Sequence, residues 1–279
     1  MTGSTAPMPQ RTTAEVEWHR TATVTDTSLP ATNPVVEAIL ERLPVLPAGS
    51  TALDLACGNG QPTFVLAQRR PELAVLGVDS TSALIEQAQL KARENSVSNV
   101  RFEVMSVDRL ELADQSMNAA VSHFGLLQEG GIAESAHELA RVLAPAAPFS
   151  LAAFDDMALN TLMSTIAGVL AEHVPPDTLP DFDYLTKLAA PGLRESVLRE
   201  SGLAEVHSQL FRWSIPLPSF DVVWHIATAP VPFARAIEAL ADADISEVRS
   251  ELEAAVSRYR SEGVGFTFPM ACRLFWGHR

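Results

Sequence analysis

The stretch Leu53-Asp54-Leu55-Ala56-Cys57-Gly58-Asn59-Gly60 decides the fold of this 279-residue chain. It begins as a short apolar run, over residues 52–56, and ends in two closely spaced glycines. Glycine lets the backbone turn tightly beside a ligand, and the start of a following helix offers unpaired N–H groups to it. The stretch therefore predicts a strand, a ligand-binding loop and a helix over roughly residues 62–70.

The alternation of strand and helix patterns continues to residue 154. Asn33 and Pro34 mark the start of a preceding helix, as N-cap and first helical residue. Further strands are expected over 73–78, 100–105, 117–123 and 148–154, and further helices from about 81 to 95 and over 134–143. Strands that alternate with helices of this length predict an α/β fold, a doubly wound, Rossmann-like parallel sheet.

The pattern changes after residue 154. An apolar helix is expected over 157–173, a loop over 177–184, a helix over 191–201 and a strand over 206–216. Mostly helical sequence over 218–262 precedes a last strand over 263–277. We expect three parts: an N-terminal arm, partly disordered, over 1–32; a cofactor-binding half over 33–155; and the rest of the sheet, with helices forming a substrate lid, over 156–279.

Composition indicates which binding partners and which cellular location to expect. The 20 basic and 34 acidic residues give a net charge of −14, which disfavours binding to nucleic acid and to acidic membranes. The longest uncharged run has 15 residues, too few to span a bilayer, and no apolar segment in residues 1–11 suggests a signal peptide. Cys57 and Cys272 form neither a metal-ligand spacing nor a disulfide framework. We therefore expect a cytoplasmic protein without a bound metal.

The glycine loop distinguishes between two kinds of ligand. Dinucleotide-binding proteins have a third glycine three residues after the second, and here that position is Thr63, preceded by Pro62. An acidic residue, Asp54, instead lies within the strand, four residues before Gly58. The pattern therefore disfavours a dinucleotide.

The same residues resemble motif I of the class I S-adenosylmethionine-dependent methyltransferases, and the resemblance continues in order over about residues 50–155. Asp79 follows Gly60 by 19 residues at the end of the second strand, and Asp108 follows the third strand. The resemblance implies a seven-stranded methyltransferase sheet and S-adenosyl-L-methionine as cofactor, with its ribose on Asp79 and its adenine near Asp108. The residues expected to bind the cofactor are Asp54, Ala56, Gly58, Gly60, Asp79, Ser80, Val107, Asp108 and His123.

Some of these residues also have purely structural interpretations. Asp79 could cap the following helix, and Asp54 could organise the glycine loop instead of meeting the amino group of the cofactor. The sequence also departs from the family pattern: Ala56 replaces its first glycine, Asn118 replaces an aspartate before the fourth strand, and Pro145-Ala146-Ala147 replaces a Pro-Gly-Gly turn.

The candidate catalytic residues are His123, at the end of the fourth strand, and its rival His225, in the later helical region. An imidazole in either place could accept a proton from the acceptor or orient it, although a buried structural histidine is an equal alternative for His123. Asp155 and Asp156 could also accept a proton. The residues expected to line the substrate pocket are Trp18, His19, Phe124, Leu127, Trp224 and His225.

We interpret the chain as an enzyme that transfers a methyl group from S-adenosylmethionine to a small, hydrophobic metabolite of bacterial secondary metabolism. One alternative is a catalyst of cyclisation or rearrangement that binds the cofactor without using its methyl group. Another is a non-enzymatic binding module. The acceptor and the oligomeric state are left open, a homodimer included.

Overall fold

A computed structural model describes residues 33–127, 131–228, 233–241 and 244–279. Most of the chain outside these ranges is the N-terminal arm, so the expectations for Trp18 and His19 lie outside the described residues.

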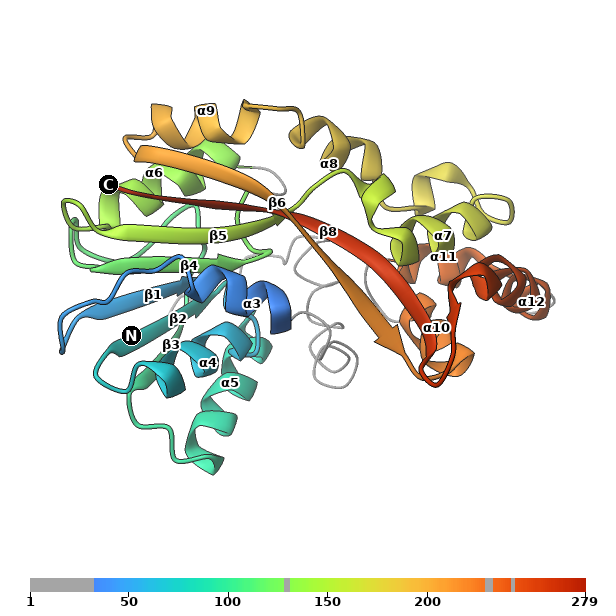
Figure 1. Ribbon diagram of the computed structural model, residues 1–279, viewed down its shortest axis with the longest axis horizontal. Helices are drawn as coiled ribbons and strands as arrows, with labels where there is room; N and C mark the ends of the chain where they lie inside the picture. Colours follow the sequence, from blue (N-terminus) through green and yellow to red (C-terminus); the bar gives the residue numbers. More distant parts are fainter. Residues whose placement is uncertain (1–32, 128–130, 229–232, 242–243) are drawn as a thin grey trace, which may run out of the picture.

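The core of the molecule is one mixed sheet with the strand order β3-β2-β1-β4-β5-β8-β6 (Figure 1). Its first five strands are parallel, while β8 runs antiparallel to β5 and β6. These strands are β1 (Thr51–Leu55), β2 (Ala74–Asp79), β3 (Val100–Val104), β4 (Ala119–His123), β5 (Pro148–Phe154), β6 (Ala204–Leu217) and β8 (Gly265–His278). The two-residue strand β7 (Arg260–Ser261) pairs with β8 beside this path. The predicted doubly wound, seven-stranded α/β fold is confirmed.

Helices cover both faces of this sheet. The first face carries α3 (Asn33–Leu40), α4 (Gln61–Arg69) and α5 (Ser82–Glu94), whose apolar side chains pack on alternate residues of β1, β2 and β4. The opposite face carries α6 (Ile132–Val142) and α9 (Leu193–Glu200), packed on the other set of alternate residues. Period-two alternation of the strands thus supplies two apolar cores.

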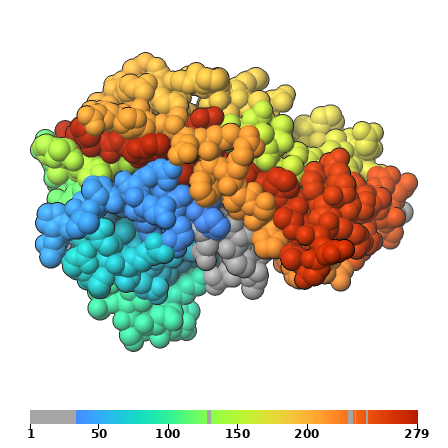
Figure 2. Space-filling view, in the orientation of Figure 1, coloured from blue at the N-terminus to red at the C-terminus, as the bar shows by residue number. Residues whose placement is uncertain are grey.

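A third core lies away from the sheet. β6 and β8 are 14 residues long each, and their paired ends extend beyond the parallel strands. This extension carries a helical lobe at one end of the molecule (Figures 1 and 2). The lobe contains α7 (Thr161–Leu170), α10 (Phe220–Ala227), α11 (Ala234–Ala239) and α12 (Ile245–Val256).

Two expectations for the region after β5 are wrong. The helix expected over 157–173 is divided into η2 (Met157–Leu159) and α7, because buried Asn160 leaves helical geometry and its Oδ1 accepts a hydrogen bond from Ala271 N of β8. The loop expected over 177–184 instead contains η3 (Pro176–Thr178) and the start of α8 (Phe182–Leu188).

Local capping explains the unexpected helix α8. The Asp181 side chain accepts a hydrogen bond from Tyr184 N, which caps the first turn, and the Phe182 ring packs edge-on against Phe233 at 6.1 Å.

Among the described helices, none combines the length and apolar character that a membrane crossing requires.

Candidate active site

The loop between β1 and α4 has an unusual backbone. Ala56, Gly58 and Gly60 have φ angles of 52°, 56° and 91°, in the left-handed region that favours glycine. A Cβ added at Gly58 would meet nothing within 4 Å, whereas one added at Gly60 would approach the Phe102 and Phe64 rings to 2.9 Å. Gly58 therefore presents its backbone to open space, and Gly60 is needed for close packing.

Asp79 lies at the carboxyl end of β2 and ties this loop in place. Its Oδ2 accepts a hydrogen bond from Gly58 N and its Oδ1 accepts one from Thr81 N, both at 2.9 Å. Burial raises the pKa of this carboxyl group, although the two backbone hydrogen bonds oppose the shift. Asp79 does not cap α5, whose N-cap is Thr81, and its two hydrogen bonds instead hold the glycine loop and the bend before that helix.

Asp54 is fully buried beneath the same loop. Its Oδ2 accepts a hydrogen bond of 2.6 Å from the Thr63 hydroxyl, which fastens β1 to α4. Its Oδ1 is buried and has no hydrogen-bond partner among the described residues. Burial, with a smaller contribution from the nearby charge of Asp79, raises the pKa of Asp54 to about 7. One oxygen therefore has a structural role, and the other is an unsatisfied acceptor next to a second carboxyl group.

The remaining expected cofactor residues lie on the same edge or just beyond it. Ser80 is exposed in the bend after β2. Val107 and Asp108 form a turn after β3, with Val107 half-buried against the core and Asp108 exposed. Because the carboxyl ends of parallel strands share one edge of the sheet, all these positions border the region where doubly wound folds bind ligands.

His123 ends β4 at this same edge. Its Nε2 is buried without a hydrogen-bond partner among the described residues, and burial lowers its pKa to about 4. Phe124 and Leu127, which follow it, have φ angles of 61° and 62°. Left-handed backbone at non-glycine residues stores strain and is common at functional sites. The geometry makes His123 a neutral hydrogen-bonding group at pH 7.

An aromatic cluster begins beside His123, and sequence reasoning missed two of its members. The Phe124 ring lies 4.5 Å from His123, stacks on Phe154 at 4.3 Å and faces Trp213 at 6.5 Å. The Trp213 Nε1 atom is buried with no hydrogen-bond partner among the described residues. Phe154 ends β5 and Trp213 lies within β6, so only the tertiary pairing of the strands assembles this group.

Trp224 and His225 lie in the helical lobe, on α10. Trp224 is half-buried under the Arg249 guanidinium at 5.3 Å, and His225 is exposed. No described contact joins His225 to His123, and Figure 1 shows α10 at the far end of the β6–β8 extension. The roles assigned to these two residues stay predictions.

The departures from the family pattern have structural consequences. Asn118 Oδ1 accepts a hydrogen bond of 2.9 Å from Thr51 N, which joins the start of β1 to the start of β4. Ala146 has a φ of 60°, so an alanine occupies a turn position that favours glycine. Asp155 is engaged by Arg273, whose Nε lies 2.7 Å from its Oδ2. Among the described residues, no three acidic, histidine or cysteine side chains form a candidate metal site.

The fold and the loop after β1 define a doubly wound α/β protein with a ligand cradle at the carboxyl edge of its sheet. Residues 52–146 match the family model described as a methyltransferase domain. A curated relative is trans-aconitate 2-methyltransferase from Methylobacterium radiotolerans, 30% identical over 178 residues, or 57% of this chain and 64% of the relative. The chain spans 19%, 64% and 59% of the lengths of the first three curated relatives it matches.

Solved structures agree with this assignment. The YcgJ protein of Bacillus subtilis has a TM-score of 0.58 at 17% identity, with 88% of this chain and 96% of that one covered. Phosphoethanolamine N-methyltransferase 2 of Haemonchus contortus, in complex with S-adenosyl-L-methionine, has a TM-score of 0.56 at 12% identity, covering 95% of this chain and 57% of that one. Residues 52–146 match a methyltransferase domain, and the chain has the fold of class I S-adenosylmethionine-dependent methyltransferases.

Proposed function

We propose that this chain binds S-adenosyl-L-methionine at the loop after β1 and transfers its methyl group to a small molecule. The observation that carries the proposal is the pair of buried carboxyl groups, Asp54 and Asp79, beneath a left-handed loop that leaves Gly58 open. Burial raises the pKa of both groups because it disfavours their ionised forms, and the positive charge of a cationic ligand would offset that penalty. The family match over residues 52–146 supports this choice of ligand.

The donor and acceptor groups present fit this cofactor. Each oxygen of Asp79 accepts one backbone N–H and keeps lone-pair capacity for a ribose hydroxyl. The unsatisfied Oδ1 of Asp54 could accept a hydrogen bond from an amino group, directly or through water. Asp108, in the turn after β3, is proposed to reach the adenine. The cofactor, when bound, supplies an electrophilic methyl group on a positively charged sulfur.

The residues of the chain then position the acceptor and exclude water. Phe124, Phe154 and Trp213 supply an apolar wall beside His123. With a pKa of about 4, His123 is a poor match for proton abstraction at pH 7, since a general base works best near the ambient pH. We therefore assign it the orientation of the acceptor, through its buried Nε2. Catalysis would depend mainly on proximity and desolvation.

The cofactor proposal is tested by calorimetry with S-adenosylhomocysteine, the demethylated cofactor. We expect S-adenosylhomocysteine to bind. NAD serves as the negative control and should not bind, because Thr63 replaces the third glycine of the dinucleotide pattern. A chain that binds NAD and not S-adenosylhomocysteine would refute the proposal.

The methyl transfer is tested by product mass. Incubation with S-adenosylmethionine and candidate acceptors should yield a product heavier by one methyl group. The alternative, cyclisation or rearrangement with the cofactor retained, uses the same cofactor residues and would leave the product mass unchanged. The curated relatives act, by their names, on acceptors as different as arsenite and trans-aconitate, so they leave the acceptor class open.

The setting of the reaction is also part of the proposal. Cys57 and Cys272 are buried, free thiols, which suits a reducing cytoplasm. A role in bacterial secondary metabolism rests on composition and resemblance alone, and association into a homodimer is tested by sedimentation of the purified chain.

A further inference from the structure

Apart from Asp54, Arg194 is the most deeply buried charged side chain in the part of the chain that the structure describes. It lies in the first turn of α9 and is 1% exposed. Its Nη1 donates a hydrogen bond of 2.6 Å to the backbone oxygen of Phe154, the last residue of β5. Because β5 runs parallel to β1, β2 and β4, this contact places the guanidinium at the same edge of the sheet as Asp79 and His123.

The rest of the Arg194 guanidinium is unsatisfied. Both Nε and Nη2 are buried and have no hydrogen-bond partner among the described residues. These two nitrogens form one edge of the planar group, with two parallel N–H bonds. That edge matches the two oxygens of a carboxylate or a phosphate. Buried arginine side chains are otherwise paired, because an unpaired buried charge is costly.

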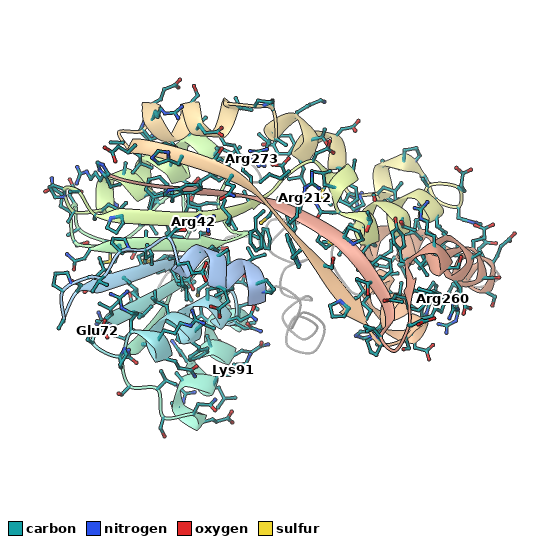
Figure 3. The ribbon with its side chains drawn as sticks, viewed as in Figure 1. Arg42, Glu72, Lys91, Arg212, Arg260 and Arg273 are labelled. Atoms are coloured by element: carbon teal, nitrogen blue, oxygen red, sulfur yellow. The ribbon has the colours of Figure 1, made fainter. Side chains whose placement is uncertain are left out.

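The neighbouring charged groups do not fill this edge. Asp155 accepts hydrogen bonds from Asp156 N at 2.9 Å and from Arg273 Nε at 2.7 Å, and it makes none to the Nε or Nη2 of Arg194. Arg273 lies on β8 opposite Ala153 of β5 and is labelled in Figure 3. Asp155 thus stabilises Arg194 by its charge without bonding to it. Burial lowers the pKa of Arg194 only to about 10, so the group remains a cation at pH 7.

Local charge favours a carboxylate over a phosphate. Two guanidinium groups, Arg194 and Arg273, and one carboxylate, Asp155, leave a single formal positive charge. The carboxyl group of Glu195, which accepts the Ser208 hydroxyl, brings the sum of these four charges to zero, so a bound monoanion leaves one uncompensated negative charge and a phosphate dianion leaves two. A monoanion therefore fits better than a phosphate dianion. We propose that the Nε–Nη2 edge of Arg194 binds a carboxylate group of the acceptor substrate.

This inference rests on the proposed function, because the acceptor is the molecule that a methyltransferase holds at this edge of its sheet. Arg194 anchors the acceptor and takes no part in methyl transfer. The opposite faces of the sheet then supply two kinds of contact. The wall of Phe124, Phe154 and Trp213 lies on the side of α3, and Arg194 lies on the side of α9.

The experiment measures binding of small acids to the full chain saturated with S-adenosylhomocysteine, by calorimetry. The probes are benzoate, hexanoate and trans-aconitate, with benzamide, hexanamide and inorganic phosphate as comparisons. We expect at least one carboxylate to bind and the amides and phosphate not to bind. Arg194→Lys keeps the positive charge and loses the paired N–H edge. It should therefore lower the affinity for that carboxylate by about tenfold or more.

Arg199→Gln is the matched control. Arg199 lies on the same helix, is exposed and also donates to a backbone oxygen, that of Val206 at 2.8 Å, so its replacement removes a comparable hydrogen bond away from the proposed site. The affinity of the Arg199→Gln variant for the carboxylate should stay within about twofold of that of the unchanged chain. If Arg194→Lys does not fold, the preference of the unchanged chain for acids over amides still decides.

Three results would overturn the inference: equal binding of acids and amides, stronger binding of phosphate, or unchanged carboxylate affinity in Arg194→Lys. No carboxylate binding by a chain that binds S-adenosylhomocysteine makes Arg194 a structural residue and leaves the proposed function intact. Failure to bind S-adenosylhomocysteine refutes the proposed function itself, so the two failures are distinguishable.

Discussion

Gly58 N and Asp79 Oδ2, 21 residues apart in the sequence, are joined by a hydrogen bond of 2.9 Å across the carboxyl ends of β1 and β2. The bond holds the left-handed loop against the second strand, so the backbone that faces a ligand and the carboxyl group that would bind it form one unit. Disturbing Asp79 therefore changes both the shape of the loop and its chemistry.

Asp79→Ala should lower the affinity for S-adenosylhomocysteine by roughly tenfold to a hundredfold, because hydrogen bonds to a charged acceptor contribute about 1.5–3 kcal/mol each. Calorimetry measures the affinity. Asp79→Asn keeps one acceptor oxygen for the loop and should lose less. The exposed Glu111, as Glu111→Ala, is the control. An affinity of Asp79→Ala within twofold of the unchanged chain would show that Asp79 is only a structural residue.

Asp54 should make the chain less stable as pH rises from about 4 to about 7. Its folded pKa of about 7 exceeds its ordinary value of 3.8, so in this window the folded state binds more protons than the unfolded state. The raised pKa of Asp79 acts in the same direction. Urea unfolding of the cofactor-free chain at several pH values measures the slope. The lowered pKa of His123 acts in the opposite direction between about pH 4 and pH 6.5, so the test is the difference between variants. Asp54→Asn should shift the slope towards stability that rises with pH, and an unchanged slope in that variant would assign the effect elsewhere.

Ala146→Gly should stabilise the chain. Its φ of 60° is unfavourable for a residue with a Cβ, and the hydrogen bond from Ala146 N to Arg279 O does not depend on the side chain. Relief of about 1 kcal/mol would raise Tm by about 2–4 °C. Ala92→Gly, within helix α5, is the comparison and should lower Tm. A lower Tm in Ala146→Gly would contradict the strained turn.

His123 should give turnover no titration between pH 6 and pH 8, because its pKa is lowered to about 4. If it orients the acceptor, His123→Asn should raise KM more than it lowers kcat. A general base would instead lose about 10²–10⁴ in rate. Cofactor affinity should stay nearly unchanged in both cases. His225→Asn, at an exposed position of α10, is measured in parallel, and a larger loss there would transfer the role to His225.

The helical lobe is expected to act as a lid over the acceptor. Its helices α7 and α10 pack on the β6–β8 extension, and α12 packs on α7 and α10. Hydrogen exchange over residues 161–188 and 219–227 should slow when cofactor and acceptor are bound. Exchange over α5, on the sheet, is the internal reference. Unchanged exchange in both lobe segments would count against a lid.

The sequence alone determined the parallel half of the fold and the cofactor loop. Short apolar runs end just before Gly58, at Asp79 and at His123, and the carboxyl ends of parallel strands meet at one edge of the sheet. Local signals were sufficient there because strand, loop and helix are neighbours along the chain. The same signals failed after β5, where Asn160 and Asp181 end and begin helices through contacts that the apolar pattern does not encode.

Only the tertiary structure decided which side chains share the site. Trp213 meets Phe124, and Arg194 meets the end of β5, through strand pairing and helix packing across long stretches of chain. The tertiary structure also decided the pKa values of two site residues. Burial raises that of Asp54 to about 7 and lowers that of His123 to about 4, and neither shift is evident from the sequence. The physical reason is that desolvation depends on everything packed around a group, whereas the sequence specifies only its covalent neighbours.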